Sequence, residues 1–323
     1  MKNFEDIQKL VQSDIAKTDQ VLIDHLSSDV ALINQMSGYI IGAGGKRLRP
    51  LLLLLCARAT NYQGDHHHLM AVVIELIHTA TLLHDDIVDE SNTRRGKDTA
   101  NEVWGNAASV LVGDFLYSRA FEMMVKPDSM RIMTLLSKAT NEIAQGEVMQ
   151  LLNCQNSALT EKEYYRVIER KTAVLFQAAT QIGAILSDAD EQQELALQDY
   201  GLHLGNAFQI IDDVLDYESD KETMGKEVGD DLAEGKTTLP IIYALENTSG
   251  KERELLVNAI ENADNSDIEH VIHILQTVKA FDYTRSKAQE SANLAKQSLS
   301  NLQDSDYKEA LMLLCDLSLQ RKS

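Results

Sequence analysis

Two acidic clusters with one pattern, Asp85-Asp86-Ile87-Val88-Asp89 and Asp212-Asp213-Val214-Leu215-Asp216, decide how the sequence is interpreted. Each follows an apolar run with helical periodicity, at 80–83 and at 207–211. In a helix, aspartates four residues apart project from one face about one turn apart, so the outer carboxylates of a cluster can reach one hard divalent cation. Two solvated acidic helix faces are the alternative interpretation. The repeated spacing and apolar context favour a metal site.

The sequence around these clusters predicts a mainly helical protein. The chain has 323 residues, and 44% of them are hydrophobic, which is enough for a large core. Only 3 prolines and 16 glycines interrupt it and aromatic residues make up 5%, a composition that favours helices over a β-sandwich or barrel. No linker rich in Pro, Gly or Ser divides the chain, so we expect residues 1–323 to form one all-α domain in which the two clusters face each other.

Helical periodicity runs along the whole chain. It predicts one or two helices within 4–36, then helices at 51–59, 69–89, 103–125, 130–153, 161–186, 191–217, 239–245, 252–262 and 268–278, and two more after residue 281. Thr160 with Glu163, and Ser266 with Glu269, have the form of capping boxes at two of these starts.

Charge and the distribution of apolar residues exclude several classes of function. The net charge of −20 argues against a general nucleic-acid binder, because the long-range field repels phosphate. No apolar run reaches the ~18 residues that span a bilayer. The first residues lack the apolar core of a signal peptide, so we expect a cytoplasmic protein. Cys56, Cys154 and Cys315 are widely spaced, which predicts free thiols and no disulfide framework or zinc site.

Positive residues near the clusters could hold an anionic substrate that the net charge would repel. Residues 42–50 combine three glycines with three cations immediately before a predicted helix. Glycine lets backbone amides approach phosphate oxygens, while Lys46 and the neighbouring arginines supply charged donors. The segment lacks the spacing of a Walker loop. Arg94 and Arg95 follow the first cluster and could bind two phosphate groups, or could simply form surface salt bridges.

Taken in order, these residues resemble the trans-isoprenyl diphosphate synthases, and within that family the bacterial long-chain members of the octaprenyl type. The resemblance covers nearly the whole chain and rests on residues 44–50, 83–89, 94–96, 113–116, 171–172, 208–216 and 225–236. It implies the all-α isoprenoid synthase fold, a helical bundle around a central substrate cavity, usually as a homodimer. It also implies a prenyltransferase that adds isopentenyl diphosphate to an allylic diphosphate. Extension of farnesyl diphosphate to a product for quinone side chains, delivered to the membrane, is the activity expected of this type.

The resemblance also assigns roles position by position. It implies that Mg²⁺, as roughly two or three ions once diphosphate is bound, is held by Asp85, Asp89, Asp212 and Asp216. It places isopentenyl diphosphate at Lys46, Arg49, His78 and Arg95. It places the allylic diphosphate at Arg94, Lys171, Thr172, Gln209, Lys226 and Lys236. The catalytic candidates are Asp85, Asp89, Lys171, Asp212 and Lys226. A histidine such as His78 on an apolar helix is ordinarily a core residue, but its place in this pattern favours binding.

Product length is expected to depend on the helix that carries the first cluster. Ala80 and Thr81 stand where short-chain members of the family tend to carry aromatic residues, so their small side chains would leave a tunnel open. Phe121, Met123 and Met124, on the next predicted helix, are candidates for the tunnel floor. An apolar stripe that contains methionine also fits a plain core, so both interpretations stand.

Other functions fit the sequence less well. A terpene cyclase would ionise the same kind of substrate, but cyclases carry an Asn/Ser/Glu motif where this chain has its second acidic cluster. The loop at 42–50 would also have no second diphosphate to bind. A synthase of shorter products remains an alternative. A non-catalytic regulatory subunit of a heteromeric synthase is a further one, although both acidic clusters are intact here.

Overall fold

The computed structural model describes residues 1–42, 44–94, 96–218 and 228–321. The predicted all-α class is confirmed, because the described elements are helices apart from one hairpin of β1 (Thr93–Arg94) and β2 (Lys97–Asp98), paired antiparallel. The sequence does not predict this hairpin, since strands of two residues are too short to show alternation.

The described helices follow the predicted order, but three of them begin within 4–36, where one or two were predicted, and the short helix α13 was not predicted. They are α1 (Phe4–Leu10), α2 (Gln12–Leu26), α3 (Ala31–Gly42), α4 (Leu48–Ala59), α5 (His66–Val88), α6 (Ala100–Trp104), α7 (Asn106–Met124), α8 (Met130–Asn153), α9 (Glu161–Ile168), the π-helix η1 (Glu169–Ala173), α10 (Val174–Leu186), α11 (Glu191–Glu218), α13 (Asp230–Ala233), α14 (Leu239–Asn247), α15 (Gly250–Glu261), α16 (Ile268–Thr277), α17 (Ala280–Ser298), the 3₁₀-helix η2 (Leu299–Asn301) and α18 (Asp306–Leu319).

The differences from the predicted helices have local causes. The helix predicted at 103–125 is divided into α6 and α7 by Gly105, whose φ of 83° is unfavourable for other residues. The capping box of Thr160 and Glu163 is confirmed. The one predicted at Ser266 is wrong: α16 starts after Asp267 without a side-chain cap, and the Ser266 N–H donates to Asp264 instead.

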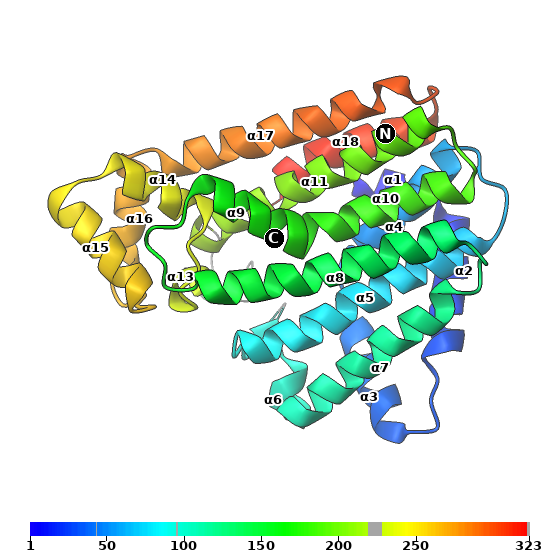
Figure 1. Cartoon of the computed structure of the whole chain (residues 1–323), viewed down its shortest axis with the longest axis horizontal. Helices are drawn as coiled ribbons and strands as arrows, with labels where there is room; N and C mark the ends of the chain where they lie inside the picture. Colours follow the sequence, from blue (N-terminus) through cyan, green and yellow to red (C-terminus); the bar gives the residue numbers. More distant parts are fainter. Residues whose placement is uncertain (43, 95, 219–227, 322–323) are drawn as a thin grey trace.

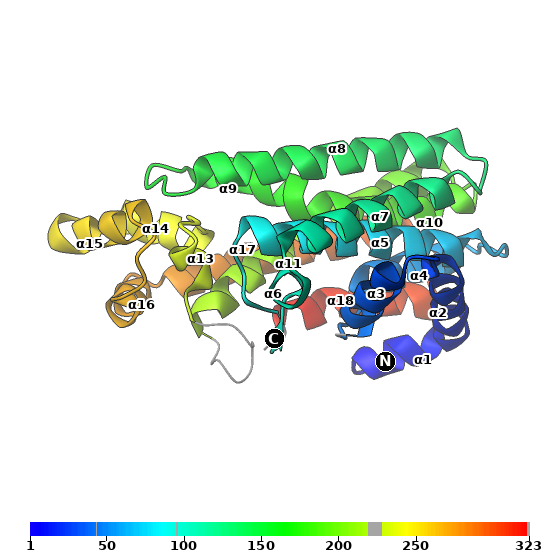
Figure 2. The same ribbon diagram turned by 90° about the horizontal axis from the view of Figure 1, so that it is seen from below.

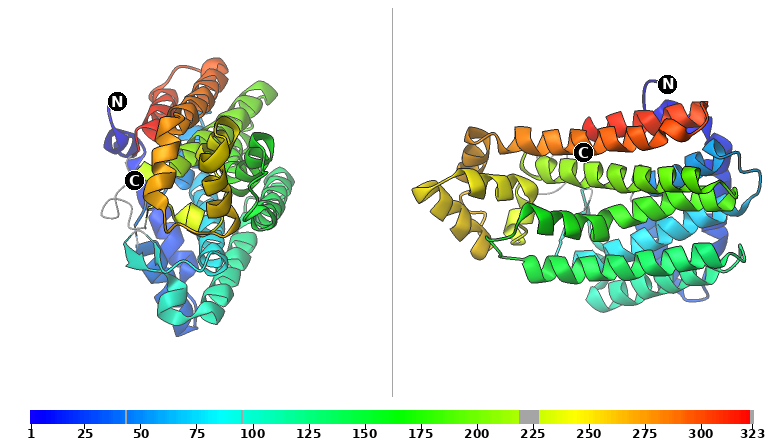
Figure 3. Two further views of the ribbon diagram at one scale, coloured as in Figure 1. Left: turned by 90° about the vertical axis from the view of Figure 1, so that its left-hand side faces the viewer. Right: turned by 45° about the horizontal axis from the view of Figure 1, so that its top comes forward.

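The long helices lie side by side along the long axis of the molecule (Figure 1). α10 is central, because it contacts α4, α5, α8 and α11. Seen from below, α8 covers one face of the bundle, and α1 and α18 lie toward the opposite face (Figure 2). α14, α15 and α16 form a small group at one end (Figure 3). Within the described chain, we find no helix that combines the length and the apolar character needed to cross a membrane.

Two glycines let helices in the middle of the bundle approach each other unusually closely. A Cβ at Gly183 of α10 would lie 2.7 Å from the Ala57 nitrogen of α4. A Cβ at Gly205 of α11 would lie 2.6 Å from the Cα of Ala173, the last residue of η1. Because protein interiors are close-packed, contacts of this kind fix α4, η1, α10 and α11 relative to one another. This framework carries the cations and carboxylates described next.

Candidate active site

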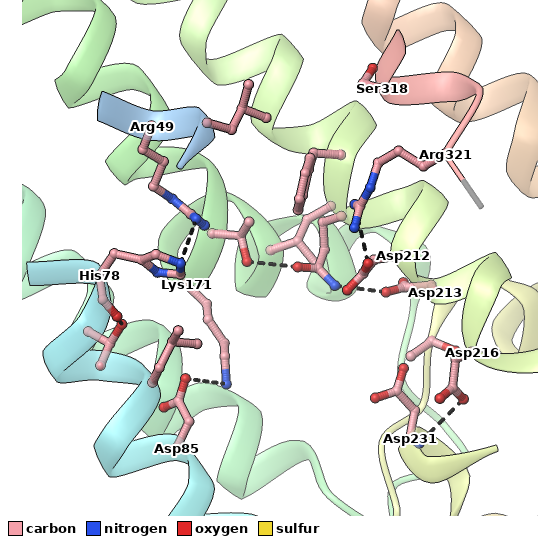
Figure 4. Close-up of a pocket in the computed structure, with 18 of the residues that line it drawn as sticks. Arg49, His78, Asp85, Lys171, Asp212, Asp213, Asp216, Asp231, Ser318 and Arg321 are labelled. Carbon is pink, nitrogen blue, oxygen red and sulfur yellow. Dashed lines mark hydrogen bonds and ion pairs between the residues drawn. The ribbon is translucent and has the colours of Figure 1, made fainter. Parts of the chain in front are cut away.

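One cavity of about 1000 Å³ brings the two acidic clusters together. Asp85 in the last turn of α5 and Asp89 at its C-cap line one wall. Asp212 and Asp216 of α11 line another. Figure 4 shows Asp85 and the α11 aspartates on opposite sides of the space, with Lys171 between the helices near Asp85. The prediction that the two clusters face each other is confirmed.

At the first cluster, Lys171 lies between two carboxylates. Its ammonium is 2.6 Å from Glu147 of α8 and 3.9 Å from Asp85. Burial raises the pKa of Asp85, Lys171 opposes this shift, and Asp89 adds to it. Burial and the nearby Asp85 raise the pKa of Glu147 to about 7. Partial burial therefore disfavours the charged forms of these carboxylates, and a divalent cation bound here would offset that cost.

Lys236 connects the first cluster with the segment that follows α13. Its ammonium is 2.9 Å from Asp89 and also pairs with Glu234. Burial opposes its charge, but Asp231, Glu234 and Asp89 together raise the pKa of Lys236 above its ordinary value. Lys236 therefore remains a cation inside the cavity and can serve as a diphosphate ligand.

At the second cluster, Asp212 pairs with Arg321 at 3.3 Å, and the Arg321 guanidinium stacks on Phe208 at 3.9 Å from the ring centroid. The backbone N–H of Asp231 donates to Asp216 at 3.4 Å, so the start of α13 is held against α11 (Figure 4). Two carboxylates of α11 thus contact a guanidinium that follows α18 and a backbone N–H of α13 at this wall.

The middle aspartate of the second cluster has a different environment. Asp213 is 2% exposed and accepts hydrogen bonds from Tyr164 of α9 at 2.5 Å and from the Gln209 amide at 2.9 Å. Gln209 in turn accepts from the Thr172 hydroxyl at 2.8 Å. This chain orients the Thr172 and Gln209 side chains at the cavity wall, so Asp213 has a supporting role.

Lys171 and Thr172 belong to the π-helix η1, which interrupts the single helix predicted over 161–186. Single π turns occur frequently at functional sites because the extra residue changes which side chains share a face. Here both Lys171 and Thr172 line the cavity although they are adjacent in sequence. Local helix propensity does not reveal such a turn, so it could not be predicted from the sequence.

A second group of positive residues lies at the start of α4 and on α5. Arg49 Nη1 is 3.1 Å from His78 Nε2, and the Arg49 guanidinium lies 4.5 Å from the centre of the Phe176 ring. Burial and the neighbouring Arg321 lower the pKa of Lys46. Lys46, Arg49 and His78 all line the cavity, so three of the four residues expected at the isopentenyl diphosphate site are brought together.

The remaining predicted ligands are placed as follows. Arg94 lines the cavity, and its guanidinium pairs with Asp86 at 2.6 Å, the middle aspartate of the first cluster. Arg95 and Lys226 lie outside the described residues, so their roles stay predictions.

The predicted chain-length residues divide into two groups. Thr81 lines the cavity. Ala80, Met123 and Met124 are at most 1% exposed and pack in the core shared by α5 and α7, whereas Phe121 is exposed. Their influence on product length stays a prediction, with Thr81 as the member in direct contact with the cavity.

Some residues of the cavity wall have no role predicted from the sequence. Among them are Glu147, Tyr164 and Arg321, and also Asp231, which lies in a segment that carries the family resemblance. Glu147 had a weak signal, because Glu147, Gln150 and Asn153 recur at three-residue spacing on α8 and all line the cavity. Arg321 had none, since it lies in a polar stretch after α18 that resembles any exposed terminus.

Comparison with known proteins agrees with this geometry. Residues 30–278 match the family described as polyprenyl synthetase. The chain is 47% identical over 320 residues to the octaprenyl diphosphate synthase of Escherichia coli (strain K12), a match covering 99% of each chain. It is 46% identical over 318 residues to an all-trans-nonaprenyl-diphosphate synthase (geranyl-diphosphate specific) of Rhodobacter capsulatus, covering 98% of each. The fold matches a polyprenyl synthase from Caulobacter crescentus CB15, complexed with calcium and isoprenyl diphosphate, with a TM-score of 0.96 at 41% identity over 100% of this chain and 99% of that one. The predicted helical fold is confirmed by this likeness.

Proposed function

The chain belongs to the polyprenyl synthetase family, and from this premise we propose that it is a long-chain synthase whose product is octaprenyl diphosphate. As a member of that family it is a prenyltransferase, which condenses isopentenyl diphosphate with an allylic diphosphate. One observation carries the proposal: a single cavity is lined by both acidic clusters and by two separate groups of cations. Similarity to the E. coli octaprenyl enzyme supports the octaprenyl product.

The two groups of cations suggest where each substrate binds. We place isopentenyl diphosphate against Lys46, Arg49 and His78, since they approach one another across α4 and α5. We place the allylic diphosphate between the acidic clusters. Its ligands there would be Arg94, Lys171, Thr172, Gln209 and Lys236. Two diphosphates held at different walls of one cavity would present the reacting carbons to each other.

A divalent cation fits the carboxylate wall, and we propose that it is Mg²⁺. Asp85, Asp89, Asp212 and Asp216 offer only oxygen ligands, the type that Mg²⁺ prefers. Burial and the neighbouring Asp89 raise the pKa of Asp85 although Lys171, Arg94 and Lys236 oppose the shift, and a bound cation would favour its charged form. When bound, Mg²⁺ would supply charge that stabilises the departing diphosphate.

The protein's own groups would assist ionisation and protect the cation that forms. Lys171 and Lys236 can donate to the diphosphate as the C–O bond of the allylic substrate breaks. The double bond of isopentenyl diphosphate then attacks the allylic C1, and a proton is lost. We assign that proton to the released diphosphate, because no dedicated base emerges from the sequence motifs. Leu82, Ile168 and Phe208 of the cavity wall would keep water from the cation.

Incubation with Mg²⁺, farnesyl diphosphate and labelled isopentenyl diphosphate, followed by sizing of the dephosphorylated products, tests the proposal. An octaprenyl alcohol is the expected product. A shorter linear alcohol would identify a shorter-chain synthase, and a cyclic hydrocarbon would identify a cyclase. Absence of product until a partner subunit is added would identify a regulatory subunit.

We further propose that the chain works in the cytoplasm as one domain and as a homodimer, and that its product passes to the membrane for quinone synthesis. Exposed apolar residues on α7 and α8 support a protein interface, since Leu111 is 68% exposed and Leu152 is 77% exposed. Sedimentation analysis of the purified protein tests the dimer.

A further inference from the structure

α8 and the π-helix η1 touch at a point where α8 has no room for a side chain. A Cβ at Gly146 of α8 would lie 2.7 Å from the backbone nitrogen of Lys171 and 3.0 Å from the carbonyl carbon of Arg170. The residue after Gly146 is Glu147, whose carboxylate lies 2.6 Å from the Lys171 ammonium. The close approach of the two backbones therefore determines that Glu147 and Lys171 meet.

The Lys171 ammonium has two carboxylates within reach, and it lies nearer to Glu147 than to Asp85, which is 3.9 Å away. The three side chains are 15% to 30% exposed, so their attraction is weakened by solvent less than that of a surface pair. Two carboxylates thus attract the Lys171 ammonium. Asp85 is assigned to metal binding, whereas Glu147 has no role in the proposed reaction.

We propose that Glu147 is a positioning residue, which holds Lys171 away from Asp85 and so keeps Asp85 available to a divalent cation and Lys171 available to the allylic diphosphate. This inference rests on the proposed function. Without the Glu147 charge, the ammonium would close on Asp85. A cation that binds Asp85 would then have to displace Lys171 first.

A simpler electrostatic effect must be separated from this one. Removal of any negative charge near the cluster weakens cation binding through space, whether or not Lys171 is present. Positioning instead acts only through Lys171. A double-mutant cycle of Glu147→Gln and Lys171→Gln distinguishes the two, because the cycle isolates the coupling between the paired groups.

The measurement is calorimetric titration of inorganic diphosphate into the protein at a fixed Mg²⁺ concentration. Glu147→Gln, which is nearly isosteric, is expected to weaken binding about tenfold. In the Lys171→Gln background the same change is expected to weaken it by less than about twofold. Glu142→Gln is the matched control, because Glu142 is on the same helix, pairs with Lys138 at 3.7 Å and does not line the cavity. It should leave binding unchanged, and unfolding midpoints verify that all variants are folded.

Steady-state turnover supplies a second readout. Glu147→Gln should raise the Mg²⁺ concentration for half-maximal activity, while kcat at saturating Mg²⁺ changes by less than about threefold. Undiminished diphosphate binding by Glu147→Gln, or an equal loss in the Lys171→Gln background, would overturn the positioning role alone. Wild-type protein that neither binds diphosphate with Mg²⁺ nor condenses the substrates would overturn the proposed function and this inference with it.

Discussion

Replacement of Gly146 by alanine should separate the geometry of the active site from the stability of the fold. The added Cβ would lie 2.7 Å from the Lys171 nitrogen, whereas ordinary contacts begin at 3.4 Å, so α8 and η1 must separate by roughly 0.7 Å. Both partners are backbone, so no flexible side chain can yield. Overpacking of this kind costs about 1–3 kcal/mol. The greater helix propensity of alanine returns about 1 kcal/mol, so the expected net loss of stability is about 0–2 kcal/mol.

The effect on activity should exceed the effect on stability. A displacement of 1 Å in a catalytic group can lower a rate by about a hundredfold, so a shift of Lys171 by most of that distance should lower kcat/KM for the allylic diphosphate by about tenfold or more. Urea unfolding gives the free energy of unfolding, and initial rates with the allylic substrate varied give kcat/KM.

Two other glycines provide controls. Gly183→Ala creates an equally close contact, 2.7 Å from the Ala57 nitrogen, at a position that does not line the cavity. It should lower stability by a similar amount while kcat/KM stays within about twofold of wild type. Gly38→Ala, where a Cβ meets nothing within 4 Å, should raise stability by about 0.4–1 kcal/mol. Equal losses of activity in Gly146→Ala and Gly183→Ala would refute a specific role for the contact between α8 and η1.

Three further outcomes are expected. EDTA should abolish condensation, and Asp85→Ala should lower turnover by several factors of ten, each corresponding to ~1.4 kcal/mol of barrier, with little change in unfolding; full turnover in the folded variant would contradict metal binding there. Arg49→Ala should chiefly raise KM for isopentenyl diphosphate, and Lys171→Ala should chiefly impair ionisation of the allylic diphosphate. Steady-state kinetics in which both variants affect the same substrate would reject the assignment of the two substrates to separate sites. Ala80→Phe should shorten the product, as chromatography of the dephosphorylated chains will reveal; unchanged length in an active variant would shift attention to Thr81.

The helices were largely predictable from sequence because each buries one apolar face. Apolar residues therefore recur with the helical period, and this pattern is visible in the sequence alone. The start and end of α8 agree with the prediction, and α11 extends one residue beyond it. The predictions failed where a single residue or the tertiary packing determines the local backbone conformation. Gly105 divides a continuous apolar pattern, and the η1 turn forms where Gly146 and Gly205 press against its backbone.

The site was predictable where it depends on repeated local patterns. The outer aspartates of each cluster lie four residues apart, so one helix presents them together without help from the rest of the fold. Glu147 and Arg321 reach the same cavity from α8 and from the segment after α18, and only packing brings them there. A lone charge in a polar stretch has no local signature, whatever it contacts in the folded protein.

The close contacts around α10 also bear on efforts to change what this enzyme makes. A library designed to alter chain length would normally randomise every residue of the central helices. Most variants at positions such as Gly183 and Gly205 would be destabilised, because nearly every substitution there pushes helices apart. A library that keeps these glycines fixed and varies the residues around Thr81 would sample product length while the framework that carries the cations and carboxylates of the cavity stays intact.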